Sequence, residues 1–328
     1  MIVGFSKQES QKVLYHYPTP DSPPEVQYKQ RLNPYLVDAP DAFIWNRSTP
    51  ICDVPRMGIG NKPIDGGNYL FTDDEFREFL SRDPEARQYF HPWIGSKEFL
   101  HGYHRWVLWT GEMSPAELKA HPLVAERVQA VHDFRLQSSS TQTVRLAGKP
   151  QRFHVENMPD GESIVVPEVS SERRKYIPLG FIEPEVFASN LVKIVPNASL
   201  FLFGVLHSEI HNVWMRAVAG RLKSDYRYSA GVVYNNFVFP GVTDKQRKDV
   251  EEAAQRVLNA RGNYKDVMLA DMYDPDDEWM YPELFGAHSE LDSAVAQCYS
   301  FALDGLEHDE REQFILSELL TRHAKIVS

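Results

Sequence analysis

The stretch SLFLFGVLHSEIHNVWMRAVAGRLKSDYRYS, residues 199–229, decides the fold of this chain, because a long apolar periodicity gives way abruptly to a charged segment. From about 199 to 219 apolar side chains recur at helical spacing, which predicts one long helix with Gly220 as its stop. In the basic segment 220–229, Lys223, Asp225 and Arg227 would project to one side if the segment is extended. The apolar face of the helix comprises Phe203, Leu206, Ile210, Val213, Trp214 and Ala217.

Upstream of this stretch, the patterns predict mixed helices and strands. Two helices are expected after Thr72 and Ser114, because each is followed three residues later by a Glu, the signature of a capping box. The class expected for residues 56–240 is α+β. Strands are predicted at 103–109, 164–167, 176–182 and 231–239.

The two ends of the chain differ from this middle region. Beyond residue 240 the patterns are purely helical: Thr243 or Asp244 can cap a helix that continues to Gly262, and two more helices are expected around Leu291 and Phe314. The first 55 residues are Pro-rich and irregular. They open with an apolar, strand-like run at 2–5 that begins too abruptly for the natural edge of a domain.

Size and composition limit the class of protein. The 328 residues, 42% hydrophobic and 25% charged, suffice for two compact domains. Because no stretch approaches the roughly 18 apolar residues of a membrane span and the N-terminus lacks a signal-peptide pattern, the expected location is the cytoplasm. Cys52 and Cys298 lie far apart and in no metal-ligand spacing, so packing roles are expected for both.

The net charge of −11 would not by itself suggest a nucleic-acid partner, because phosphate contacts require Lys and Arg. The acidity is concentrated at the C-terminal end: residues 241–328 hold 9 Lys and Arg against 19 Asp and Glu, whereas residues 170–230 hold 8 against 5. A locally basic segment beside an acidic appendage therefore remains compatible with DNA.

Three local patterns suggest other chemistry. His207 and His211 stand at i and i+4 and could share a metal ion, but the zincin arrangement places Glu directly after the first His, and here it comes one position late. The run 274–278 offers oxygen ligands without calcium-loop spacing, which favours a solvated acidic turn. The glycines at 58, 60, 66 and 67 lack the context of a phosphate cradle, which favours a turn-rich loop with positive φ angles.

Several long, correctly ordered motifs resemble the region that follows the methyltransferase domain in the MmeI-like, type IIL restriction-modification enzymes. The matches cover nearly the whole chain. They are PRM at 55–57, GNKPIDGG at 60–67, PWIGSKEF at 92–99, VSSERRKYIP at 169–178, FGVL at 203–206, Trp214, Arg216, residues 220–229, YNNF at 234–237, AQ at 254–255, LAD at 269–271 and residues 287–292.

The resemblance implies three parts: the tail end of a methyltransferase domain and a linker at 1–55, a target recognition domain of mixed α+β structure at 56–240, and a small all-helical C-terminal domain at 241–328. It implies a sequence-specific reader of double-stranded DNA within a site-specific, N6-adenine DNA methyltransferase and restriction enzyme. The expected partners are duplex DNA and the methyltransferase domain of the same enzyme, with no membrane.

Catalysis is expected to come from elsewhere in such an enzyme. A methyltransferase acting on an exocyclic amino group needs a glycine-rich turn for S-adenosylmethionine and an Asn/Asp-Pro-Pro-aromatic motif for the flipped base, and neither pattern occurs here. We therefore expect no catalytic residue, metal site or cofactor in this chain, and S-adenosylmethionine in the preceding methyltransferase domain. The alternative function is an assembly module whose acidic helical tail docks onto that domain.

The resemblance and the chemistry of base edges also predict contact residues. Lys223 can donate to guanine and Asp225 can accept from the paired cytosine, so the pair suits one G·C pair. Residues at other matching positions that would face bases are Glu168, Asn190, Leu191 and Arg227. Residues suited to phosphates are Lys62, Arg173, Arg174, Lys175, Arg216 and Arg221.

Two simpler interpretations stay open for individual residues of this set. Glu172, Arg173 and Arg174 could form an ordinary surface ion-pair cluster. Tyr226 and Tyr228 could simply pack on the opposite face of a strand.

Overall fold

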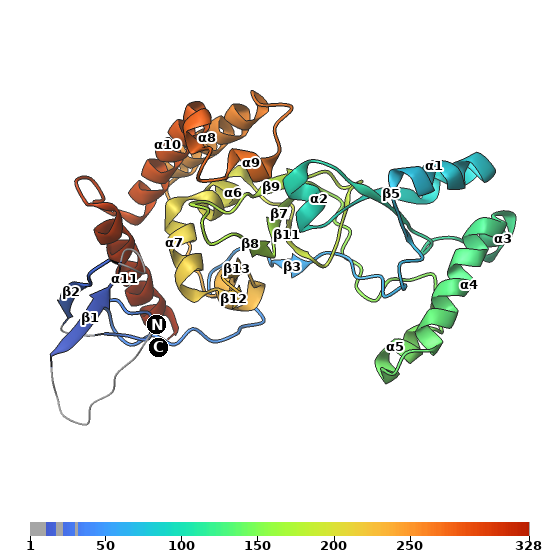
Figure 1. Ribbon diagram of the computed structural model, residues 1–328, viewed down its shortest axis with the longest axis horizontal. Coiled ribbons are helices and arrows are strands. Elements are labelled where there is room, and N and C mark those ends of the chain that lie inside the picture. The colour runs from blue at the N-terminus through green and yellow to red at the C-terminus, as the bar shows by residue number, and fades with distance from the viewer. Residues whose placement is uncertain (1–10, 18–21, 30–31, 328) are drawn as a thin grey trace.

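The computed structural model describes residues 11–17, 22–29 and 32–327. The molecule is elongated, with an outer sheet and its helices at one end and the C-terminal helices at the other (Figure 1). The predicted α+β class is confirmed. The apolar run predicted at 2–5 lies outside the described residues.

The N-terminal part contains one hairpin and a long irregular segment. Strands β1 (Lys12–His16) and β2 (Glu25–Lys29) pair antiparallel. The chain then runs without regular structure along residues 231–235, where Arg47 N donates to Gly231 O at 2.8 Å and Ile51 N to Asn235 O at 2.9 Å. The irregular character predicted for 1–55 thus holds for most of its described residues, with the hairpin as the exception.

The outer sheet has the order β10-β5-β6-β4, with β10 parallel to β5 and the other pairs antiparallel. An aromatic core, including Phe71, Phe76, Phe90 and Trp93, packs the helices against it. Both predicted capping boxes are present, Thr72 with Glu75 and Ser114 with Glu117. The elements are β4 (Leu70–Phe71), α1 (Asp73–Arg82), η1 (Pro84–Tyr89), β5 (Phe90–Ile94), α2 (Ser96–His101), β6 (Arg105–Leu108), α3 (Pro115–Ala120), α4 (Pro122–Leu136), α5 (Thr141–Leu146) and β10 (Phe187–Ala188).

Two further sheets form the centre of the molecule. One has the order β3-β11-β7-β9, with every pair antiparallel, and the other the order β12-β13-β8. The strand predicted at 176–182 is formed only at its end, as β9. The elements are β3 (Gly58–Ile59), β7 (Ser163–Pro167), β8 (Val169–Ser170), β9 (Gly180–Ile182), β11 (Val192–Pro196), β12 (Gly220–Leu222) and β13 (Asp225–Arg227).

The single helix predicted for 199–219 is wrong, because the chain forms two helices there. Helix α6 (Leu200–His207) ends and α7 (Glu209–Val218) begins at Ser208. Ser208 adopts an extended conformation, and its hydroxyl accepts from His211 N while donating to Val205 O at 2.8 Å. A serine that caps the next helix in this way competes with the continuous helical ladder, and the chain bends there.

The strand predicted at 231–239 is also wrong. Residues Ala230–Tyr234 form the π-helical turn η2, with Ser229 capping Val232 N. Val233 and Tyr234 are fully buried and Trp214 Nε1 donates to Val233 O at 2.9 Å, so tertiary packing against α7 overrides the β propensity of this apolar run.

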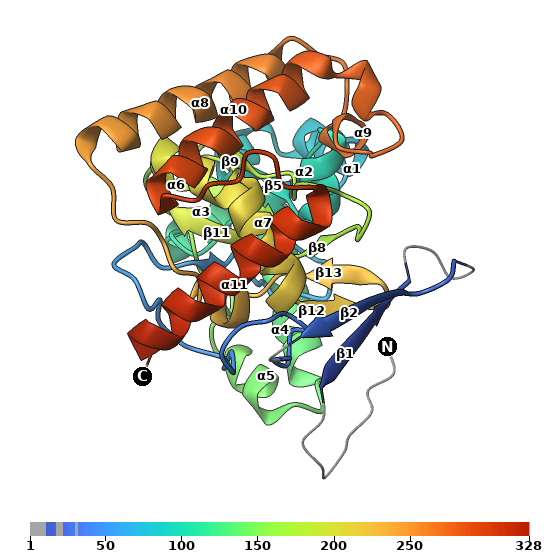
Figure 2. The same cartoon turned by 90° about the vertical axis from the view of Figure 1, so that its left-hand side faces the viewer.

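The C-terminal part is helical, as predicted, and Thr243 caps its first helix through a capping box with Gln246. Helices α8 and α10 lie side by side over α6, and α11 crosses α7 (Figure 2). Gly204 lets α6 approach α8, since a Cβ at that position would lie 2.8 Å from Val250 Cγ1. One hydrophobic core therefore extends from the central sheets into this helical part. The elements are α8 (Asp244–Gly262), α9 (Leu269–Met272), η3 (Glu278–Met280), α10 (Pro282–Tyr299) and α11 (His308–Val327).

Candidate nucleic-acid interface

The basic segment 220–229 forms a hairpin, not the single extended strand on which the same-side argument was based. Leu222 pairs with Asp225, which leaves Lys223 and Ser224 as a two-residue turn. Lys223 has φ 58°, so the chain reverses at this residue. The expectation that the side chains of 223, 225 and 227 project to the same side of one strand is therefore wrong for Lys223. Both Lys223 and Asp225 nevertheless lie at the tip of the hairpin.

The hairpin is anchored to the core through its aromatic residues. Tyr226 is buried beneath Arg221, whose guanidinium lies 3.8 Å from the ring centroid. Tyr228 is also buried, and its hydroxyl lies 2.9 Å from His211 Nε2 on α7. Both tyrosines thus pack inward, as the simpler interpretation predicts, while Arg221, Lys223 and Arg227 remain exposed.

The third strand of this small sheet brings Glu168 to the hairpin. Arg227 pairs with Val169 in β8, and Tyr228 N donates to Glu168 O at 2.7 Å. The Glu168 carboxylate accepts from Arg227 Nε at 2.7 Å and from Lys193 Nζ at 2.6 Å. Burial alone would raise the pKa of this carboxyl, but the hydrogen bonds and charges of Lys193 and Arg227 outweigh burial and hold the pKa below its usual range.

The loop that precedes β11 supplies the other two predicted base-facing residues. Glu168 N donates to Leu191 O at 3.3 Å, and Ser96 Oγ donates to the same oxygen at 2.6 Å. The Leu191 side chain is 57% exposed, and Asn190 beside it is half-buried. The fold therefore brings Glu168, Leu191 and Arg227 to adjacent positions, with Asn190 next along the chain and the hairpin tip extending beyond them.

Most of the cations predicted to contact phosphates already have partners within the chain. Arg173 pairs with Asp276 at 2.5 Å and Arg221 with Glu172 at 3.3 Å, so the suggested local cluster of 172–174 is replaced by contacts with more distant residues. The side chain of Arg216 is only 16% exposed and donates to Glu312 and to Lys175 O.

The other three predicted phosphate contacts differ in exposure. Arg174 donates to Ala270 O at 3.2 Å, and burial lowers the pKa of its guanidinium. The exposed Lys175 lies over the Tyr176 ring at 5.1 Å. Lys62 is exposed as well, and its backbone pairs with Val155.

The two histidines weighed as metal ligands serve as hydrogen-bonding residues of the core. Ser208 separates them onto different helices. His207 Nε2 lies 3.0 Å from an Arg261 nitrogen, while His211 contacts Tyr228. Burial lowers the pKa of both imidazoles, that of His211 to about 3. Within the ranges that the structure describes, no three His, Cys, Asp or Glu side chains are grouped to hold a metal ion.

The other two local patterns also have structural roles. In the acidic run 274–278, Asp276 binds Arg173, which ties this turn to the recognition region. The expected positive φ angles occur at Gly66 (63°) and Gly67 (84°), whereas the expectation is wrong for Gly58, which lies in β3, and for Gly60.

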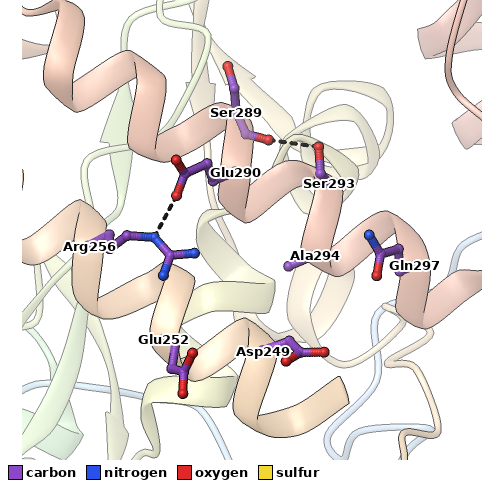
Figure 3. Close-up of a pocket in the computed structure, with 8 residues that line it drawn as sticks. All are labelled: Asp249, Glu252, Arg256, Ser289, Glu290, Ser293, Ala294 and Gln297. Atoms are coloured by element: carbon purple, nitrogen blue, oxygen red, sulfur yellow. Dashed lines mark hydrogen bonds and ion pairs between the residues drawn. The ribbon is translucent and has the colours of Figure 1, made fainter. Parts of the chain in front are cut away.

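A groove lies between α8 and α10, and none of its lining residues belongs to the candidate interface (Figure 3). Its charged lining residues are Asp249, Glu252, Arg256 and Glu290, of which Arg256 and Glu290 form an ion pair at 2.5 Å. Because carboxylates outnumber the single guanidinium, this groove repels phosphate and does not extend the candidate interface.

Two residues of the site went unpredicted. Lys193 carried a signal, since it is a lone charge in the apolar run VKIVP of β11, and an ammonium in such a strand requires a buried partner. Ser96 carried none, because its bond to Leu191 O joins residues 95 positions apart.

The comparisons with known proteins agree over almost all of this chain. The model of the MmeI target recognition domain matches residues 38–241, and that of the MmeI C-terminal domain matches residues 242–326. DNA methyltransferase A of Bacillus subtilis is 38% identical over 288 residues, which are 88% of this chain and 32% of that protein.

A solved structure of the type IIL restriction-modification enzyme MmeI in complex with DNA is 39% identical, with a TM-score of 0.89, over 98% of this chain and 42% of the solved one. The chain thus spans less than half the length of each relative. In the part of this chain that the structure describes, no helix is both long and apolar enough to span a bilayer.

Proposed function

This chain belongs to the family of the MmeI target recognition and C-terminal domains, and from that membership we propose that it reads a specific sequence in duplex DNA and positions a methyltransferase domain of the same enzyme on it. The observation that carries the proposal is the arrangement around the hairpin. Glu168 forms hydrogen bonds with both Leu191 and Arg227, and Lys223 and Asp225 extend beyond them at the tip.

The chemistry of these side chains suits the edges of base pairs. A guanidinium can donate to O6 and N7 of guanine, as can an ammonium, and a carboxylate can accept from N4 of cytosine. At the hairpin tip, Lys223 and Asp225 are close enough in the chain to read the two bases of one G·C pair. Around them, the ion-paired cations can exchange carboxylates for phosphates, which sets the register without reading sequence.

The reaction itself belongs to the partner domain. In the proposed enzyme that domain takes the methyl group from S-adenosylmethionine and receives an adenine flipped out of the duplex, and this chain selects which adenine is presented. The contribution of this chain is thus binding and orientation. Restriction activity would likewise reside outside these 328 residues.

A salt series tests the proposal. If about six cations engage phosphates, duplex affinity should fall roughly 1,000-fold between 50 and 200 mM salt. Replacing the exposed Arg173 by Gln should lower the salt slope by about one, whereas Arg77→Gln, a matched exposed arginine on α1 paired with Asp74, should leave it unchanged. Absent or salt-independent duplex binding contradicts the proposal.

A second function, assembly with the rest of the enzyme, is favoured by several exposed aromatic side chains in the N-terminal part. Tyr15 and Tyr28 of the β1–β2 hairpin are 57% and 65% exposed, and Trp45, stacked on Phe43, is 70% exposed. Apolar surface of this kind marks protein contacts. Salt-insensitive binding to a methyltransferase fragment, weakened by Tyr28→Ser with Trp45→Ser, would support it. This function is compatible with DNA reading.

A further inference from the structure

Lys193 occupies an unusual position for a lysine. It lies in β11 between Val192 and Ile194, paired on both sides by β7 and β3, and its side chain is only 9% exposed. Burying an ammonium is costly unless it is paired, and Lys193 meets that cost through Glu168 Oε2 at 2.6 Å. An apolar residue would fill such a strand position at least as favourably, because a buried ion pair adds little net stability.

The same carboxylate also holds the exposed side chain that faces the proposed DNA surface. Glu168 Oε1 accepts from Arg227 Nε, while the Arg227 side chain is 60% exposed. Nε is the only nitrogen of this guanidinium that the described residues bond, so the two terminal amino groups stay available for a base. The Glu168 carboxylate and its two cationic partners together carry a net charge of +1, and Arg227 is the exposed member of the three.

We propose that Lys193 is a positioning residue for base recognition, an inference that rests on the proposed function. Its ammonium fixes the carboxylate of Glu168, and Glu168 in turn fixes the direction of Arg227. Recognition of the base faced by Glu168 and recognition of the base faced by Arg227 therefore depend on each other through these contacts. Without Lys193, the Glu168 carboxylate keeps Arg227 as its only side-chain partner, and its Oε2 loses its hydrogen bond. The orientation of Glu168 then changes, and the orientation of Arg227 changes with it.

The test measures base preference at every position of the target by selecting duplexes from a random pool with the full chain. Lys193→Met should lose roughly tenfold or more of the discrimination at two positions together, and leave the others unchanged. Lys193→Arg, which keeps the charge, should restore much of it. Lys248→Met removes an exposed lysine paired with Glu252 at 3.6 Å and serves as the matched control, with wild-type preferences expected.

Glu168→Gln provides a second route if Lys193→Met does not fold, since it keeps the shape of the side chain and removes the charge. It should relax the Arg227 position as well as its own. A folded Lys193→Met with wild-type preferences, an equal loss at all positions, or a Glu168→Gln that alters one position only would each overturn the inference while leaving the function standing. A wild-type chain that enriches no sequence would refute the proposed function, and the inference with it.

Discussion

Exchanging the charges at the hairpin tip, by Lys223→Glu together with Asp225→Arg, should change the base that the chain specifies at one position. In the proposed arrangement the ammonium of Lys223 faces guanine and the carboxylate of Asp225 faces the paired cytosine. The exchanged pair presents an acceptor where the donor was and a donor where the acceptor was. The preferred base should therefore change from G to C.

The structure indicates that this exchange is tolerated by the fold. Lys223 is exposed, and the free-energy cost of its positive φ angle is about the same for a glutamate as for a lysine. Asp225 is half-buried and acts electrostatically on Arg174, so an arginine at this position introduces a like charge beside Arg174. We expect the free energy of unfolding to change by no more than about 1 kcal/mol.

The effect on recognition should be larger than the effect on stability. A good base contact is worth about 1–3 kcal/mol, and about 1.4 kcal/mol corresponds to tenfold. A preference for G of at least about tenfold should become a preference for C of similar size. Selection of random duplexes by the two chains, or methylation mapping with the intact enzyme, measures it. An unchanged base in a folded, DNA-binding variant would refute the assignment of Lys223 and Asp225.

Two further predictions concern stability. Arg135 is fully buried and donates to the backbone carbonyls of residues 63, 64, 146, 149 and 152. Arg135→Met should therefore lower the free energy of unfolding in urea by about 3–5 kcal/mol, whereas Arg145→Met, at an exposed position, should change it little. Equal effects of the two substitutions would contradict the structural role of Arg135. Burial raises the pKa of Asp292 to about 7, so this carboxyl contributes stability that falls as the pH rises from about 4 to 7, whereas the buried His207 and His211, with lowered pKa values, contribute the opposite slope. Asp292→Asn removes only the contribution of the carboxyl, so the gain in stability from pH 5 to pH 8 in urea titrations should be larger in this variant than in the wild type, and an equal pH dependence of the two would contradict the raised pKa.

Features fixed by neighbouring residues could be predicted from the sequence. The capping boxes at Thr72, Ser114 and Thr243 each lie within four residues, and the helix after Thr243 runs to Gly262 as its periodicity indicates. The break at Ser208 could not be predicted from periodicity, because the apolar spacing continues across it and only the serine's bonds reveal the new cap.

The candidate site shows the same division. Its segment was predictable from the motif 220–229, but the turn was not, since Lys223 adopts a positive φ angle where Gly or Asn would have signalled it. The hydrogen-bond and ion-pair partners of the site residues could not be predicted from the sequence either. Glu168 meets Lys193 across 25 positions and Arg173 meets Asp276 across 103, and such pairs depend on the tertiary fold alone.

The most direct test of the central claim is the affinity of this chain for its selected duplex, compared with a scrambled duplex of the same composition at physiological salt. A sequence-reading domain should bind the selected duplex at least about 1,000-fold more tightly, and single base-pair changes in the site should each cost about 1–3 kcal/mol. Equal affinities for the two duplexes would contradict the claim, whatever the absolute affinity.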